Sequence, residues 1–222
     1  MKLCILIPVF NGDKTIKALI EKIRVFTDDI IVVDDGSTDN TAMIAKESKV
    51  IIISHSKNKG KGESLKSGFG YILKNTDFKY VIVMDADAQH DPRFIPDFLK
   101  AVHQKGADIV IGNRMEYTHD MPAMRRLTNK TMSFIISKVT KQDIPDSQCG
   151  YRLLKRKVLE RVKIETSKYD MESEILFKAA KQHFKIDSVK ISTVYTDQKS
   201  NIKPLIDTLR FIRLLINFVL KK

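Results

Sequence analysis

The chain has 222 residues, 43% of them hydrophobic, which is typical of one soluble globular domain. Its formal net charge of +12 predicts a polyanionic partner: nucleic acid, anionic lipid or a phosphorylated substrate. Its two cysteines, Cys4 and Cys149, exclude a disulfide framework and favour a reducing cytoplasm.

The N-terminal apolar run predicts a strand rather than a targeting signal. Pro8 interrupts the run, and no small-residue cleavage site follows it. No apolar run in the chain reaches the roughly 18 residues that a membrane-spanning helix needs. Cys4 has the position of a core residue in this strand. Cys149 has no histidine paired with it by a local signature, so we do not expect a nucleophilic thiol there.

Strand and helix patterns alternate along the first half of the chain. The apolar runs that predict strands are Leu3–Val9, Ile30–Val33, Val50–Ile53, Tyr80–Met84 and Ala107–Gly112. The segments with helical spacing or capping signals are Asp13–Phe26, Thr38–Glu47, Gly62–Leu73 and Asp91–Gln104. Repeated strand–helix units of this length predict an α/β fold, with a mostly parallel sheet flanked by helices on both faces.

After Arg114 the pattern changes. Three further helices, a polar loop and a strand are expected. The helices are Pro122–Thr140, Lys155–Val162 and Met171–His183, the loop is Asp143–Arg152, and the strand is Ile186–Val194. We therefore divide the chain into a main domain, residues 1–200, and a C-terminal amphipathic helix, residues 201–222.

Polar clusters follow the expected strands or a short connection after them. Because an open parallel sheet binds ligands at the carboxyl ends of its strands, this alignment predicts one site at that edge. The clusters are Asn11-Gly12, Asp34-Asp35-Gly36, Lys59–Gly62, the pair Asp85 and Asp87, and Asn113-Arg114.

The pair Asp85 and Asp87 is the most informative of these clusters. Residues two apart in a strand lie on the same side, so both carboxylates can bind one cation. Gln89, at the next alternate position, can add an amide oxygen. Oxygen ligands suit Mg2+ or Mn2+, which can in turn carry a substrate diphosphate. The alternatives are two solvated surface acids and, for His90, a structural rather than a metal-binding histidine.

Two other clusters suit a nucleotide. A helix cap needs only one acid, whereas Asp34 and Asp35 supply two. An acid at this position can also accept hydrogen bonds from a base or from ribose hydroxyls. Gly60 and Gly62 precede a helix and let backbone N–H groups approach a phosphate or a sugar. A flexible surface turn is the alternative for the glycines.

A basic stretch opens at Arg114. Arg125 and Asn129 are four residues apart and share one face of a predicted helix. The planar fork of an arginine suits phosphate oxygens, so one or two of the arginines are expected to bind an anion. A solvated basic surface accounts for most of the lysines.

The segment Ile202–Lys222 has the pattern of a helix with a narrow polar stripe and a wide apolar arc. Such a helix can cover the core, pair in a dimer or lie in a membrane interface. We expect partial contact with the membrane surface, because the basic charge adds attraction to anionic lipid.

Four ordered motifs resemble those of the family 2 glycosyltransferases. They are Ile7–Asn11, Val33–Asp39, Asn58–Gly68 and Met84–Pro92. Within that family the chain is most similar to dolichyl-phosphate mannose synthase and related polyprenyl-phosphate sugar transferases. The resemblance covers about residues 3–200. Gly12 stands where the family often has Glu, and Asn129 stands where Ser is common.

The resemblance implies a glycosyltransferase A-type, Rossmann-like catalytic domain. It implies inverting transfer of a hexose from a GDP- or UDP-linked donor to a polyprenyl phosphate at the cytoplasmic face of the membrane. It places the donor nucleotide-sugar against Pro8, Asn11, Asp34, Asp35, Gly60, Gly62 and Asp85. It assigns a Mg2+ or Mn2+ ion to Asp85, Asp87 and Gln89, and the acceptor phosphate to Arg114, Arg125, Asn129 and Ser200. The residues that it implies for catalysis are Asp85, Asp87, Arg114 and Arg125.

Three other functions remain open from the sequence. A sugar hydroxyl acceptor would need a general base, for which Asp143, Asp146, Glu172 and Glu174 are candidates. A lipid phosphate needs none, because its second pKa, near 6, leaves it mostly dianionic at pH 7. The same fold can transfer a nucleotidyl group. A basic nucleic-acid-binding module is disfavoured, because the aromatic-rich sheet signature of RNA binders is missing. The sequence leaves the oligomeric state open.

Overall fold

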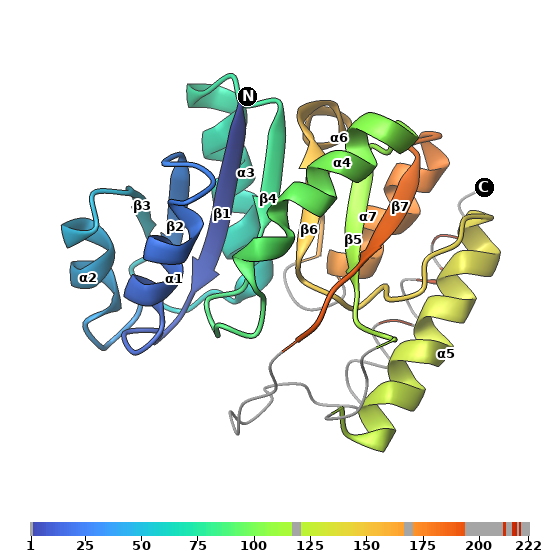
Figure 1. The fold of residues 1–222 in the computed structure, drawn as a ribbon, viewed down its shortest axis with the longest axis horizontal. Helices are drawn as coiled ribbons and strands as arrows, with labels where there is room; N and C mark the ends of the chain where they lie inside the picture. Colours follow the sequence, from blue (N-terminus) through green and yellow to red (C-terminus); the bar gives the residue numbers. More distant parts are fainter. Residues whose placement is uncertain are drawn as a thin grey trace.

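The structure is a computed structural model that describes residues 2–116, 121–166 and 171–193, together with 211, 215, 216 and 218. A seven-stranded sheet forms the centre of this part of the chain (Figure 1). Its strands are β1 (Leu3–Val9), β2 (Ile30–Asp34), β3 (Ile51–Ser54), β4 (Tyr80–Val83), β5 (Ile109–Asn113), β6 (Arg152–Lys155) and β7 (Ile186–Lys190).

The strands lie in the order β3-β2-β1-β4-β6-β5-β7. All neighbours run parallel except β6, which is antiparallel to both β4 and β5. The register places Leu6 of β1 beside Ile31 of β2 and Val83 of β4. The carboxyl ends of β1, β2 and β4 therefore meet at one edge of the sheet, as the sequence predicts.

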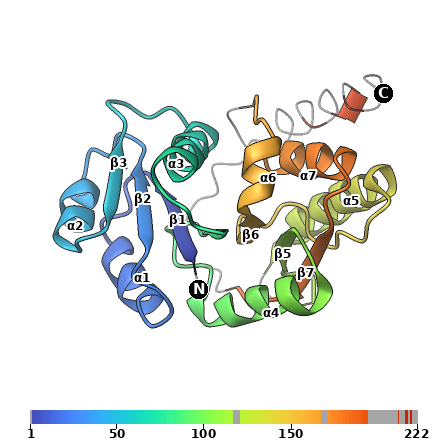
Figure 2. The ribbon, with the colours of Figure 1, turned by 90° about the horizontal axis from the view of Figure 1, so that it is seen from above.

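Helices cover both faces of the sheet. The helices are α1 (Ile16–Ile23), α2 (Thr41–Glu47), α3 (Lys61–Asn75), α4 (Ile95–Lys105), α5 (Ala123–Thr140), α6 (Arg156–Arg161) and α7 (Met171–Lys181), with a 3-10 turn at Pro92–Phe94. Figure 2 shows α1 and α4 on one face, and α3, α6 and α7 on the other. This architecture confirms the predicted α/β fold with a mostly parallel sheet.

Strand β6 was not predicted. The sequence analysis assigns its first residue, Arg152, to a polar loop and its last, Lys155, to a helix. Only Leu153 and Leu154 between them are apolar, and two residues are too few to show an alternating pattern. The strand forms because both leucines are buried and the Arg152 side chain is also buried, where backbone carbonyl groups accept its hydrogen bonds.

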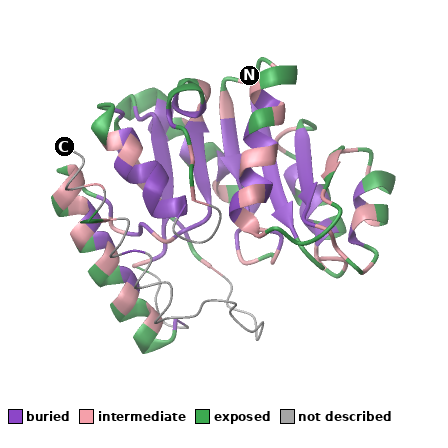
Figure 3. Cartoon of the chain, turned by 180° about the vertical axis from the view of Figure 1, so that it is seen from behind, coloured by how far each residue is buried: buried purple, intermediate pink, exposed green. Residues whose placement is uncertain are grey.

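The core explains why the other strands are easy to recognise. Every residue of β1 is buried, as a central parallel strand covered on both faces requires. Figure 3 shows the same burial across the inner strands. Cys4 belongs to this core, and burial raises the pKa of its thiol. Burial also raises the pKa of Cys149, to about 12, so both thiols stay protonated and unreactive at neutral pH.

Most of the predicted C-terminal helix lies outside the described residues. Where the structure describes it, aromatic side chains pack on α7. The ring of Phe218 stacks on Phe177 with 4.7 Å between centroids, and that of Phe211 lies 6.4 Å from Phe177. Phe211 is buried. Within the described ranges, no helix is long and apolar enough to cross a membrane.

Candidate active site

The predicted site residues gather at the carboxyl edge of the sheet, at the bottom of Figure 1. Asn11 follows β1, Asp34 ends β2, Asp85 and Asp87 follow β4, and Arg114 follows β5. Pro8, near the end of β1, pairs with Val33 of β2. The sheet thus brings together residues that lie far apart in the sequence. Ser200 lies outside the described residues.

Asp35 holds the turn before α3 in place. Its Oδ1 accepts a hydrogen bond from the backbone N–H of Lys59 at 3.0 Å, and its Oδ2 accepts one from Gly60 at 2.7 Å. The Nδ1 of His55 lies 2.6 Å from the same Oδ1, and His55 Nε2 lies 2.9 Å from the hydroxyl of Ser67. The sequence analysis missed His55, which gives no local signal of this role.

Three loops are joined around the space where a nucleotide is expected. The Oδ1 atom of Asn11 accepts a hydrogen bond from the backbone of Thr38 at 2.9 Å, and Asp34 accepts one from Ser37 at 3.1 Å. Gly60 has a φ of 97°, which favours glycine, and directly precedes α3. Gly62 is buried in the first turn of that helix. Asp34 and Asn11 therefore support the site at least partly by shaping these loops.

A partly buried ion cluster includes Asp85, one of the predicted metal ligands. The Nζ atom of Lys61 is 2.7 Å from Asp85 Oδ1 and 2.9 Å from Glu172 Oε1. Burial opposes the charged form of Lys61, but the two carboxylates outweigh it and raise the pKa of the lysine. At Asp85 burial also opposes the charged form, but Lys61 together with the other positive groups nearby outweighs it and lowers the pKa of that carboxyl. Lys61 and Glu172 thus belong to the site.

Gly150 allows this cluster to form. A Cβ atom added at this position would lie 2.5 Å from Asp85 Oδ2 and 2.8 Å from Lys61 Nζ. The loop before β6 therefore packs its bare backbone directly against the ion pair. A larger residue at this position would displace one of the two charged groups.

The surroundings of Asp87 and His90 shift the pKa of each group towards its neutral form. Burial and the nearby charge of Asp85 raise the pKa of Asp87. The backbone N–H of Gln89 donates a hydrogen bond to Asp87 Oδ1 at 3.0 Å. Burial lowers the pKa of His90 to about 4, and its ring stacks on Tyr151 at 5.1 Å between centroids. His90 Nδ1 is buried and has no hydrogen-bond partner within the described ranges.

The acid pair suits a divalent cation. Within the described ranges, no group of three or more His, Cys, Asp or Glu side chains has the arrangement of a metal site. Mg2+, however, is usually held by one or two carboxylates, water and substrate phosphates. The Lys61 ammonium on Asp85 shows that the site attracts a cation, and the charge of Asp85 adds to the effect of burial in raising the pKa of Asp87. Asp85, Asp87 and Gln89 therefore fit such an ion.

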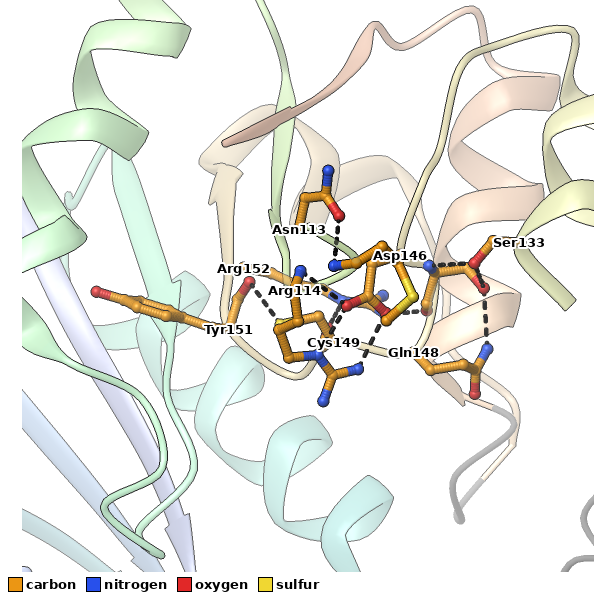
Figure 4. A network of polar contacts seen from close by, with 10 residues as sticks. Asn113, Arg114, Ser133, Asp146, Gln148, Cys149, Tyr151 and Arg152 are labelled. Atoms are coloured by element: carbon orange, nitrogen blue, oxygen red, sulfur yellow. Dashed lines mark hydrogen bonds and ion pairs between the residues drawn. The ribbon is translucent and has the colours of Figure 1, made fainter. Parts of the chain in front are cut away.

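Arg114 is held by Asp146 (Figure 4). The guanidinium Nε donates to Asp146 Oδ2 at 2.7 Å and Nη2 donates to Oδ1 at 3.0 Å, while both residues are buried. The positive charge of Arg114 still helps to lower the pKa of Asp85. Arg114 is thus a fixed charge near the acid pair, and its fork is occupied at least in part by a carboxylate of the same chain.

Arg152 organises the loop that carries Asp146 and Gly150. Its guanidinium donates to the carbonyl groups of Cys149 at 2.7 Å, Glu172 at 2.7 Å and Ser147 at 2.6 Å. These three bonds tie the loop to the first turn of α7, so that Glu172 can reach Lys61. Nothing in the sequence pattern distinguishes Arg152 from a surface arginine.

Helix α5 carries Arg125 and Asn129, and Arg125 lies close enough to act on the acid pair. The positive charge of Arg125 acts on Asp87, where it lowers the pKa against the larger effect of burial. Asn129, one turn further along the helix, is buried, and its Nδ2 atom has no hydrogen-bond partner in the part of the chain that the structure describes. A buried amide donor of this kind is costly unless an acceptor oxygen is supplied.

Glu174 has a structural role. Its carboxylate accepts hydrogen bonds from the backbone of Glu165 and Thr166, each at 2.9 Å, and from the Thr166 hydroxyl at 2.7 Å. Lys178 Nζ lies 2.6 Å away. Burial would raise the pKa of Glu174, but these partners outweigh it and lower the pKa. The carboxylate therefore holds the segment before α7 rather than serving as a base.

We expect Glu174→Gln to lower the free energy of unfolding by about 2 kcal/mol at pH 7, because charge-assisted hydrogen bonds are lost. The folded-state pKa lies below the ordinary value of 4.5, so the carboxylate stabilises the fold fully above that value. This contribution is lost as the pH falls through the folded-state pKa. Urea unfolding of both proteins at pH 7 and pH 4 measures the difference, which should shrink at the lower pH. A constant difference would contradict this role.

Comparison with known proteins decides the family. The family model described as Glycosyl transferase family 2 matches residues 4–163. The chain belongs to glycosyl transferase family 2. This match confirms the resemblance found in the four sequence motifs, and it places the acid pair and the Asp34-Asp35 turn within the matched residues.

Several relatives of this family 2 glycosyltransferase are similar over most of its length. An uncharacterized protein of Methanocaldococcus jannaschii is 34% identical over 87% of this chain and 88% of its own. UDP-N-acetylglucosamine–dolichyl-phosphate N-acetylglucosaminyltransferase of Methanococcus voltae is 30% identical, with 87% and 86% covered. Dolichol-phosphate mannosyltransferase of Pyrococcus furiosus is 32% identical over 80% of this chain and 53% of the relative.

Solved structures confirm the fold of this family 2 glycosyltransferase. Glucosyl-3-phosphoglycerate synthase of Mycobacterium tuberculosis, in complex with Mn2+, UDP-glucose and phosphoglyceric acid, superposes with a TM-score of 0.76. The match covers 98% of this chain and 79% of the synthase at 19% identity. The mostly parallel sheet with flanking helices is thus the glycosyltransferase A-type fold predicted from the motifs.

Proposed function

We propose that this family 2 glycosyltransferase transfers a hexose, with inversion, from a GDP- or UDP-linked donor to a polyprenyl phosphate at the cytoplasmic face of the membrane. The observation that carries this proposal lies on α5, where the charge of Arg125 acts on Asp87 and the buried amide of Asn129 has no acceptor among the described residues. A phosphate supplies both the negative charge and the oxygen. The named relatives from Methanococcus voltae and Pyrococcus furiosus, which use dolichyl or dolichol phosphate, support it.

On the donor side, Asp85, Asp87 and Gln89 would hold Mg2+ or Mn2+. That ion would supply positive charge to the departing nucleoside diphosphate. Lys61 places a second positive charge in the same cluster. The loops joined by Asn11, Asp34, Asp35 and Gly60 would enclose the nucleoside beside Pro8, with Gly62 at the start of α3. Residues 1–200 would form the catalytic unit and residues 201–222 a separate helix.

On the acceptor side, the chain needs to position a nucleophile rather than to create one. A phosphate monoester is mostly dianionic at pH 7 and attacks without a general base. Arg125 and Asn129 would hold its oxygens close to the donor, and Arg114 would add a fixed positive charge. Holding two anionic substrates together requires this compensation.

A sugar hydroxyl is the less favoured acceptor, because the candidate bases are engaged. Asp146 pairs with Arg114, Glu172 with Lys61, and Glu174 with the segment before α7. Asp143 is exposed. None of these four carboxylates is poised to take a proton from a hydroxyl group.

Labelled nucleotide-sugars test the proposal directly. The protein is incubated with GDP- and UDP-hexoses, Mn2+ and either polyprenyl phosphate or the matching polyprenol. We expect label in the lipid extract with the phosphate and none with the alcohol. Label that enters only polysaccharide would establish the hydroxyl acceptor instead, and diphosphate release from a nucleoside triphosphate would indicate nucleotidyl transfer.

Arg125→Ala is expected to lower kcat/KM for the acceptor about 10²-fold, because a preorganised charge is lost from the reacting phosphate. Arg126→Ala is the matched control, since the neighbouring residue on α5 is exposed. A water-soluble, short-chain polyprenyl phosphate keeps membrane binding out of the measurement. Equal losses in the two variants would show that Arg125 acts only through the general basic charge of the helix.

A further inference from the structure

The outer face of α5 carries large apolar side chains that are unusually exposed. The exposed fractions are 70% for Met124, 62% for Leu127 and 63% for Phe134. These positions are three and seven residues apart, so they form one stripe along the helix. Single exposed apolar residues are ordinary, but a stripe of three on one helix suggests a surface that contacts something apolar.

The same helix is strongly basic. Residues 123–140 contain Arg125, Arg126, Lys130 and Lys138 and no acidic residue. Lys138 extends its Nζ atom over the ring of Phe134, 5.6 Å from the centroid, so charge and apolar surface lie together. An apolar stripe flanked by cations is the pattern of a helix that lies in the interface of an anionic bilayer.

The position of α5 also suits a surface helix. Its inner face is buried through Asn129, Ser133 and Ile136, so the helix is fixed to the domain. Figures 1 and 3 show it along one side of the molecule, with its outer residues exposed over its length. Its N-terminal end, which carries Arg125, lies near the carboxyl edge of the sheet. One helix thus joins the site to the exposed stripe.

We propose that the outer face of α5 docks on an anionic bilayer surface. The stripe of Met124, Leu127 and Phe134 enters the headgroup boundary, and the flanking cations contact lipid phosphates. This assigns membrane contact to a helix other than the C-terminal one, whose described aromatic residues pack on α7 instead. The proposal extends the proposed function, whose acceptor is a membrane lipid, but it does not depend on it.

Vesicle flotation without donor or acceptor tests the docking. The full chain is mixed with phosphatidylcholine vesicles that contain or lack phosphatidylglycerol. We expect binding to the anionic vesicles that weakens at high salt. The double variant Leu127→Ser/Phe134→Ser should bind about 10-fold or more weakly. The matched control Val25→Ser/Met43→Ser, at residues that are 80% and 54% exposed elsewhere, should bind like the parent.

Each contrary result is distinct. Equal binding by the parent and the α5 double variant would overturn the proposal, as would a parent chain that binds no anionic vesicle. Light scattering that shows a dimeric parent and, unlike the control, a monomeric α5 double variant would mean that the stripe binds a second copy of the chain. The membrane proposal would then be overturned. Transfer to the short-chain acceptor should be unchanged in the α5 variant, which confirms its folding. Failure of that transfer in the parent would instead count against the proposed function.

Discussion

Asp87→Asn is expected to lower kcat for sugar transfer about 10²- to 10³-fold without weakening the fold. The carboxylate lies close to the charge of Asp85, and burial and that charge raise its pKa above the ordinary value. At neutral pH, keeping this group ionised therefore costs free energy in the folded state. Asparagine removes that cost together with the charge that would hold the cation. Loss of activity and unchanged or higher stability should appear in the same variant.

Two measurements separate these effects. Steady-state transfer with a fixed donor gives kcat, and urea unfolding gives the stability. Asp97→Asn, at an exposed acid on α4, is the matched control and should change neither quantity. Undiminished transfer by Asp87→Asn in the presence of a chelator would refute the proposed role of the acid pair.

Asp146→Ala should have the largest effect on stability, a loss of about 3–5 kcal/mol. The Asp146 carboxylate has no exposed surface and makes three hydrogen bonds with Arg114. Its removal leaves a buried guanidinium without this partner. Such a loss is a large share of the roughly 5–15 kcal/mol that stabilises a domain.

Comparison with an exposed ion pair makes this measurement specific. Glu160→Ala removes the carboxylate partner of Arg156 on α6, and we expect a loss of about 0.5 kcal/mol or less, because Glu160 is exposed. Arg156 also keeps its hydrogen bonds to the carbonyl groups of Leu73 and Thr76. The double variant Arg114→Met/Asp146→Ala should recover part of the stability, because neither buried charge of this ion pair remains. A loss of under about 1 kcal/mol for Asp146→Ala would mean that water or another group replaces the carboxylate.

The sequence predicts the parts of the fold that depend on local pattern. Strands β1, β2 and β4 are apolar runs followed by acids or amides, and the predicted bounds differ from the observed ones by one residue or less. Strand β6 escapes prediction because its two apolar residues carry no period. Its first residue, Arg152, is buried because three backbone carbonyl groups accept hydrogen bonds from its guanidinium. No local sequence pattern reveals these contacts.

The candidate site is predictable to the same extent. The acid pair is recognisable because it follows a predicted strand, and Arg125 because it lies on a predicted helix in a basic stretch. The pairing of Lys61 with Glu172 is not recognisable, because these residues, taken as part of a loop cluster and as a candidate base, are 111 residues apart and meet only in the folded chain. In the sequence, Arg114 is expected to bind a phosphate. The structure shows that its guanidinium is already paired with the buried carboxylate of Asp146. Residue type and spacing thus reveal which groups gather at the sheet edge, whereas ion pairing depends on the packed loops.

The place of β6 governs when activity can arise as the chain is made. β6 is synthesised after β4 and β5 but lies between them. The half with β1 to β4 can assemble from neighbouring segments, whereas β5 must wait for residues 152–155 to join it to that half. Gly150 lies just before this strand, and Glu172, which completes the ion cluster with Lys61 and Asp85, follows it. A nascent chain that stops short of β6 would thus leave β4 and β5 unjoined and would lack Glu172, so the chain cannot complete the ion cluster before it has made the strand that joins the two halves of the sheet.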